Sequence, residues 1–183
     1  MPDWLATTLW IVGPLLVVFF VGGMLLPRDF KVERSIVIAA PSEKIHPHVD
    51  SLAKWPAWSP FDTEDPTIVW EQGEQVAGVG AKRSWKSKKM GDGSQWITAS
   101  DPKTGVSMKL AMAGGCMEPF DIAIKFAPES GGTRVTWTDT GRFPSAPHWR
   151  WMGFLFVERM CGKMFEKGLK ALKHVVEDES AEG

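Results

Sequence analysis

The chain has 183 residues, with 21 Lys and Arg against 22 Asp and Glu, and a formal charge of −1 at pH 7. This balance excludes a strongly basic nucleic-acid binder, which carries a large excess of Lys and Arg. Two cysteines exclude a disulfide framework and a four-cysteine zinc site. Since the sequence has no tyrosine, ten Trp and ten Phe supply all of its aromatic surface.

The first segment, 4–26, carries no charged side chain, and 17 of its 23 residues are apolar. A helix of this length, about 35 Å, would cross a hydrocarbon core of about 30 Å. A cleaved signal peptide fits less well, because no Lys or Arg precedes the run and the run is too long. We therefore predict an uncleaved transmembrane anchor over 1–27, kinked at Pro14, with Trp4 and Trp10 near its outer end.

Basic residues follow this segment, at Arg28, Lys31 and Arg34, whereas Asp3 is the only charged side chain before it. The positive-inside rule then predicts a single-pass protein of the cell membrane with a cytoplasmic body. Only 27–29 separate the apolar run from the next extended segment, and three residues reach about 10 Å at most. The rest of the chain is therefore expected to sit against the bilayer.

The part that follows is predicted to be one domain over 28–178 with an acidic tail over 179–183. Residues 30–39 alternate in polarity, as a strand does. Pro41, followed by Glu43, then marks the start of a short helix.

Further along, glycine- and proline-rich breaks separate six strand-like segments. These strands are predicted over 67–74, 80–88, 94–100, 105–112, 120–127 and 133–140. Alternation is clearest in 105–112 and 120–127, which is typical of an antiparallel sheet with one covered face. A long helix is predicted over 148–177, because apolar residues recur every three to five positions. They are Trp149, Met152, Phe156, Met160, Met164, Leu169, Leu172 and Val176.

Five segments, in this order, carry a resemblance to a known family. They are 38–45, 55–60, 78–81 followed by Trp85, 131–137 and 165–173. Together they resemble the START-like superfamily, the SRPBCC or polyketide cyclase/dehydrase group, over about 30–176. The resemblance implies an α+β helix-grip fold, in which a curved antiparallel sheet of about seven strands wraps a long C-terminal helix and two short helices follow the first strand. It does not select a function, because members bind sterols, lipids, quinones, polyketides or plant hormones, and some act on partner proteins.

The resemblance also implies a largely apolar cavity between the sheet and the long helix. We predict that aromatic, Met and aliphatic side chains of the two walls line it, with two Trp capping one end. The predicted ligand-binding residues are Trp55, Trp58, Trp85, Met108, Leu110, Met112, Ile122, Ile124, Trp137, Met152, Phe156 and Met160. Flexible Met side chains suit a ligand of imprecise shape. The alternative is that the same residues form an ordinary core.

Few polar residues are candidates for chemistry. His46 and His48 are two apart on a helix and point away from each other, so we interpret them as surface residues and predict no metal site. Asp139 and Arg142 are the one charged pair that could move a proton, although a salt bridge is the simpler interpretation. We therefore predict no catalytic residue and no cofactor.

Five basic residues surround Trp85: Lys82, Arg83, Lys86, Lys88 and Lys89. A solvated hairpin is the simplest interpretation, and contact with anionic lipid headgroups is the alternative, at about 1 kcal/mol per residue. The two thiols, Cys116 and Cys161, lack the Cys-x-x-Cys spacing or helix N-terminus that would activate them.

We therefore predict a membrane-anchored protein that binds a hydrophobic small molecule, such as a lipid, an isoprenoid or quinone, or a polyketide-like compound. Its partners would be the bilayer, through 4–26, and this ligand; no nucleic acid is expected, and no protein partner is identified. Two alternatives stay open. One is a cyclase- or dehydratase-like enzyme that uses the same cavity, and the other is an interaction module that regulates a membrane protein.

Overall fold

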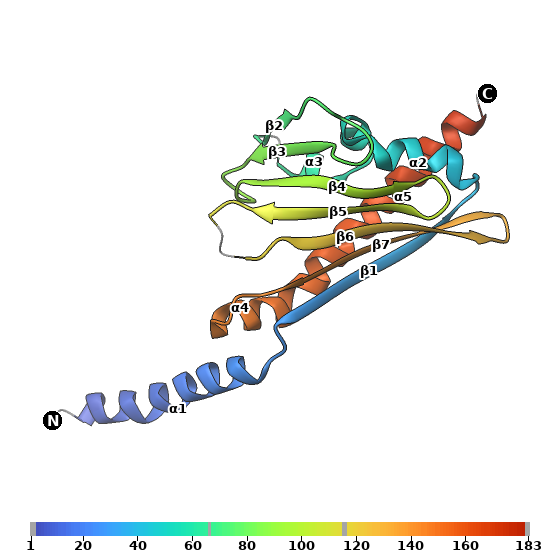
Figure 1. Ribbon diagram of the computed structural model, residues 1–183. Helices are drawn as coiled ribbons and strands as arrows, with labels where there is room; N and C mark the ends of the chain where they lie inside the picture. The colour runs from blue at the N-terminus through green and yellow to red at the C-terminus, as the bar shows by residue number, and fades with distance from the viewer. Residues whose placement is uncertain (1–2, 66, 115–116, 182–183) are drawn as a thin grey trace.

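The computed structural model describes residues 3–65, 67–114 and 117–181, and the side chains of these residues except 3–9 and 181. This part of the chain forms a seven-stranded antiparallel sheet, in the order β1-β7-β6-β5-β4-β3-β2, packed against the long helix α5 (Glu158–Ala181) (Figure 1). The predicted α+β helix-grip architecture is confirmed. The strands are β1 (Asp29–Ile38), β2 (Val69–Gln72), β3 (Lys82–Lys86), β4 (Gly93–Asp101), β5 (Gly105–Met112), β6 (Phe120–Glu129) and β7 (Gly132–Arg142).

Short helical elements follow β1, as predicted, and pack on the same face of the sheet as α5. They are α2 (Ser42–Asp50), the 3-10 segment η1 (Leu52–Ala57) and α3 (Pro60–Glu64). Pro60 starts α3, where a missing backbone N–H costs nothing.

The strand at the far edge is shorter than predicted, because β2 ends at Gln72 and β3 begins only at Lys82. Between them, Gly78 and Gly80 have φ angles of 76° and 93°. Glycine adopts this left-handed region without a steric penalty, so the backbone turns here instead of extending.

The core lies between α5 and the sheet. Trp137 of β7 stacks on Phe165 of α5, with ring centroids 4.5 Å apart and planes at 7°. Leu169 and Leu172, further along α5, are at most 1% exposed. Burying each such side chain contributes about 1.5–3 kcal/mol, which holds this half of the helix on the sheet.

The long helix begins differently from the prediction. It consists of α4 (Pro147–Met152), a π-helical turn η2 (Gly153–Val157) and α5. Its inner face continues from Phe165 back through the partly buried Cys161, which packs against the core.

Met152, Phe156 and Met160 therefore point outward, and their exposed fractions are 38%, 59% and 59%. The prediction that they form the inner wall is wrong. The sequence has two overlapping apolar stripes, offset by one residue. Because Phe165 stacks on Trp137, the stripe that contains Cys161 and Phe165 turns inward, and the stripe that contains Phe156 and Met160 turns outward.

The polar residues near α2 also differ from the prediction. His48 is buried, not on the surface, and its Nε2 atom lies 3.1 Å from Oε2 of Glu179. Burial lowers the pKa of His48 below its usual value, and the Glu179 carboxylate opposes the change. Since α5 continues through Ala181, residues 179–181 of the predicted tail are helical; 182 and 183 lie outside the described residues.

The N-terminal helix α1 (Asp3–Leu25) continues through Pro14 and extends away from the sheet (Figure 1). In the part of the chain that the structure describes, no helix is both long and apolar enough to cross a membrane. The predicted transmembrane helix is therefore not supported. The expected interfacial position of Trp4 concerns a side chain outside the described ones.

Candidate functional site

The two tryptophans that were predicted to cap a cavity lie in the centre of the core. Trp55 and Trp58 are each 2% exposed, with ring centroids 4.7 Å apart. Their indole N–H groups donate to the carbonyl oxygens of Val49 and His48, each at 3.0 Å. These bonds fix both rings, and Trp58 reaches Trp137 with a centroid distance of 5.5 Å.

The central sheet residues of the predicted site join the same core. The structure brings together five of them, all buried or packed against the buried cluster: Met108, Leu110, Ile122, Ile124 and Trp137. With the two tryptophans they fill the space between sheet and helices, and none of them lines the pockets described below.

Trp85 of β3 and Met112 of β5 lie apart from this cluster, on the part of the sheet further from β1. They line a shallow pocket of about 380 Å³ that Glu71 and Lys86 also border. The indole N–H of Trp85 donates to the Gly91 carbonyl at 2.9 Å, so the ring is held as part of the turn.

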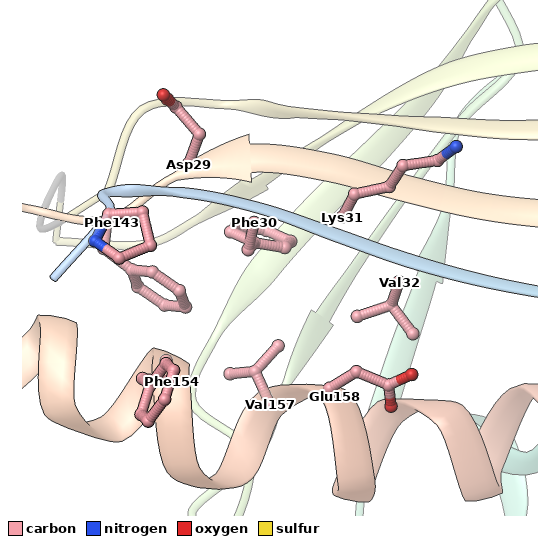
Figure 2. Close-up of a pocket in the computed structure, with 10 residues that line it drawn as sticks. Asp29, Phe30, Lys31, Val32, Phe143, Phe154, Val157 and Glu158 are labelled. Carbon is pink, nitrogen blue, oxygen red and sulfur yellow. The ribbon is translucent and has the colours of Figure 1, made fainter.

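A second pocket, of about 200 Å³, lies between β1 and η2. We call it the β1–η2 pocket. Figure 2 shows Phe30, Val32 and Phe143 facing the helix that carries Val157, while Asp29 and Lys31 point away. Its lining residues are Pro27, Asp29, Phe30, Lys31, Val32, Phe143, Gly153, Phe154, Val157 and Glu158.

Close packing of aromatic rings on a glycine shapes this pocket. A Cβ atom at Gly153 would lie 2.2 Å from the Phe143 ring, so only glycine fits there. Phe143 in turn packs on Phe30, with centroids 4.9 Å apart. Gly153 also begins the π-helical turn, an element that is frequent at functional sites. No local pattern in the sequence links Phe143 to Gly153, so sequence reasoning missed this contact.

One buried carboxyl lies next to the pocket wall. Asp139 of β7 pairs with Val32 of β1, is 9% exposed and accepts a hydrogen bond from the Trp137 indole N–H at 3.1 Å. Burial raises the pKa of Asp139 to about 7, against the lowering effect of that hydrogen bond. Burial, together with the smaller effect of the Asp139 charge, raises the pKa of the Cys161 thiol to about 11. At neutral pH, Asp139 can therefore hold or release a proton.

Arg142 is not the partner of Asp139. Its Nε atom donates to Oδ1 of Asp29 at 2.7 Å, in an exposed ion pair. Residues three apart on a strand face opposite sides of the sheet, which separates Asp139 from Arg142. The predicted proton-transfer pair is therefore wrong, whereas the alternative of a salt bridge holds for Arg142 alone.

Among the polar residues, Arg83 differs most from its predicted position. It is 1% exposed rather than solvated, and its Nη1 atom donates to Oδ1 of Asp62 at 2.9 Å. Its guanidinium carbon lies 3.9 Å from the centre of the Trp70 ring and 5.0 Å from that of Trp55. Burial lowers the pKa of Arg83, and Asp62 opposes the change.

The other basic residues of this hairpin are exposed, as predicted: Lys82, Lys86, Lys88 and Lys89. A period of two along β3 would have identified Arg83 as the inward residue, because it shares a face with Trp85. For metals, the described residues contain no group of three potential ligands. Cys116 lies outside the described residues.

The curved sheet, the long helix and the apolar pocket at their junction define a helix-grip protein. The chain belongs to the polyketide cyclase/dehydrase and lipid transport family, whose model matches residues 29–177. A search of curated proteins finds no match.

Solved structures with the same fold share little sequence with this chain. Protein CV1439 from Chromobacterium violaceum has a TM-score of 0.58 and 18% identity, over 80% of this chain and 96% of that one. The Aha1 protein from Colwellia psychrerythraea, solved as a dimer, has a TM-score of 0.55 and 18% identity, over 81% and 96%. The di-domain ARO/CYC StfQ from the steffimycin biosynthetic pathway has a TM-score of 0.61 and 10% identity, over 84% and 53%. At these identities the likeness shows the fold alone.

Proposed function

We propose that this protein binds a hydrophobic small molecule, such as a lipid, an isoprenoid or quinone, or a polyketide-like compound, in the β1–η2 pocket. The observation that carries the proposal is the apolar wall of Phe30, Phe143 and Val157 at the junction of sheet and helix. Membership in a family described as cyclase/dehydrase and lipid transport supports it, as does the likeness to an ARO/CYC protein of a biosynthetic pathway.

The size of the pocket limits what it can hold. Sites for drug-sized ligands measure about 300–1,000 Å³, whereas the β1–η2 pocket measures about 200 Å³. It therefore takes one ring or one end of a chain. The rest of the ligand would lie over the exposed side chain of Phe154, at the rim.

We also propose that binding takes place at the cytoplasmic side of the cell membrane, with α1 as the attachment. The support is the apolar surface of α1, on which Leu16 and Phe20, for example, are 51% and 52% exposed. Arg28 and Lys31 follow this helix, as the positive-inside rule requires of a cytoplasmic flank. Pro27 connects α1 directly to the pocket, so a ligand from the bilayer would have a short path.

Titration of the full chain with a fluorescent fatty acid, dansyl-undecanoic acid, tests the binding site. We expect saturable binding that weakens about tenfold in Val157→Trp, because overfilling a packed site costs about 1–3 kcal/mol. Val69→Trp is the matched control, since Val69 is 57% exposed on β2. Equal binding by the two variants would contradict the proposed site.

A second candidate function is a cyclase- or dehydratase-like enzyme, and Asp139 is the observation that favours it. A buried carboxyl that titrates near neutral pH suits general acid–base catalysis. In that case Asp139→Asn would abolish turnover of a polyketide-like substrate while dansyl-undecanoic acid still binds. Unchanged turnover in Asp139→Asn would exclude this role for Asp139.

A further inference from the structure

An apolar stripe on the outer face of the C-terminal helix is not covered by any other described part of the chain. It consists of Met152, Leu155, Phe156 and Met160, which are 38%, 51%, 59% and 59% exposed. Single exposed apolar residues are ordinary on a protein surface, but a contiguous group marks an interaction site. We call this group the outer stripe.

The start of the helix that carries the outer stripe, α4, is joined to α1 by specific contacts. The indole N–H of Trp151 donates to the carbonyl oxygen of Phe19 at 2.9 Å, and Nη1 of Arg150 donates to that of Leu26 at 3.2 Å. A Cβ atom at Gly23 would lie 2.6 Å from Cβ of Pro147, so the backbones of α1 and α4 approach closely. The two apolar surfaces therefore lie next to each other.

The surface of α1 indicates which environment surrounds α1 and the outer stripe. Its side chains are exposed at every position from 15 to 21, and each of them is apolar. A helix that is apolar all round needs an apolar environment on all sides. A protein groove covers one face of such a helix, whereas lipid covers all of them.

The charge pattern beyond the outer stripe fits the edge of a bilayer. Arg159 and Lys163 follow Phe156 at the i+3 and i+7 positions, which share a helix face. Both are exposed, and neither forms an ion pair with a residue that the structure describes. The neighbouring Glu158, by contrast, is paired with Arg34 at 2.9 Å. The face thus changes from apolar to basic with distance from α1, as a surface does that enters anionic lipid.

We propose that the outer stripe docks onto the lipid bilayer beside α1, with Arg159 and Lys163 at the anionic headgroups. This orientation rests on the membrane attachment proposed above and adds a second contact to it. It places the β1–η2 pocket at the membrane surface, because Phe154 and Val157 of η2 line that pocket.

Spin labels at three single cysteines test this orientation in the full chain, reconstituted into vesicles of phosphatidylcholine and phosphatidylglycerol. The background is Cys116→Ser with Cys161→Ala. The labelled positions are Phe156→Cys in the outer stripe, Leu16→Cys in α1 and Val69→Cys on β2, at the edge of the sheet opposite β1 (Figure 1). Paramagnetic oxygen concentrates in lipid, and a nickel chelate stays in water, so their relative collision rates report the environment of each label.

We expect oxygen to be the more frequent collider at 156 and 16, and the nickel chelate at 69. If the label at 16 lies in lipid but that at 156 collides mainly with the nickel chelate, the docking is wrong and the attachment by α1 stands. If all three collide mainly with the chelate, both are wrong. Protection of 156 from both reagents would mean that protein covers the stripe, which also overturns the docking. None of these results depends on ligand binding in the pocket.

Discussion

The two halves of the long C-terminal helix are both rich in apolar side chains but use them differently. In α5, Phe165, Leu169 and Leu172 are at most 1% exposed. In η2, Phe154 and Phe156 are 61% and 59% exposed. Helical periodicity thus identifies an apolar face without showing what covers it. The C-terminal half therefore stabilises the fold, and the N-terminal half is available for a ligand or a membrane.

We expect the largest change in the free energy of unfolding from a substitution in α5. Phe165→Ala removes the ring that stacks on Trp137, and it should lower the free energy of unfolding by about 3–5 kcal/mol. Urea denaturation of the full chain measures it. Phe156→Ala, the matched change in η2, should stay within about 0.5 kcal/mol of the unchanged protein. Similar losses in the two variants would show that both halves are packed alike.

Asp139 provides a pH-dependent test of the region between the halves. Its pKa is about 7 in the folded protein, whereas the ordinary value of an Asp carboxyl is 3.8. Between these two pH values the folded chain therefore keeps a proton that the unfolded chain has lost. Stability from this group is therefore full below about pH 4, decreases as the pH rises and is lost above about pH 7, a change of roughly 4 kcal/mol at most.

Urea denaturation of Asp139→Asn at pH 5 and pH 8 checks this prediction. The unchanged protein should lose stability between these values, whereas the variant should lose less, because its amide does not ionise. Asp121→Asn, at a residue exposed on β6, is the control and should retain the pH dependence. An equal slope in Asp139→Asn and the unchanged protein would mean that the buried carboxyl does not titrate in this range.

The smallest expected effect concerns the pocket wall. Gly153→Ala would place a methyl group 2.2 Å from the Phe143 ring, so we expect a loss of about 1–3 kcal/mol and weaker binding of dansyl-undecanoic acid. Gly13→Ala is the control, because a Cβ atom there meets nothing within 4 Å. If Gly153→Ala binds the probe as tightly as Gly13→Ala, the contact of Phe143 with residue 153 does not shape the site.

Much of the fold could be predicted from local patterns. The alternation in β5 and β6 identified their covered face, and turn residues separated the strands correctly. The inward position of Arg83 could also have been predicted, because Arg83 shares a strand face with Trp85. Its charge led to the opposite interpretation.

The candidate site depended on contacts that no local pattern contains. Whether Phe156 or Phe165 turns inward is decided by Trp137, which is distant in sequence. The pocket itself needs Phe143 to pack on Gly153 and on Phe30, three residues from separate elements. Tertiary packing, and not hydrophobicity, placed the site at the end of the sheet instead of its centre.

The most direct test of the central claim is methyl NMR of the full chain during titration with dansyl-undecanoic acid. Binding in the β1–η2 pocket should shift the methyl signals of Val32 and Val157, which line it. The signals of Val135 and Val176, buried in the central core, should remain in place. Shifts confined to the two core valines, or no saturable shift at Val32 and Val157, would contradict the claim that this protein binds hydrophobic ligands in that pocket.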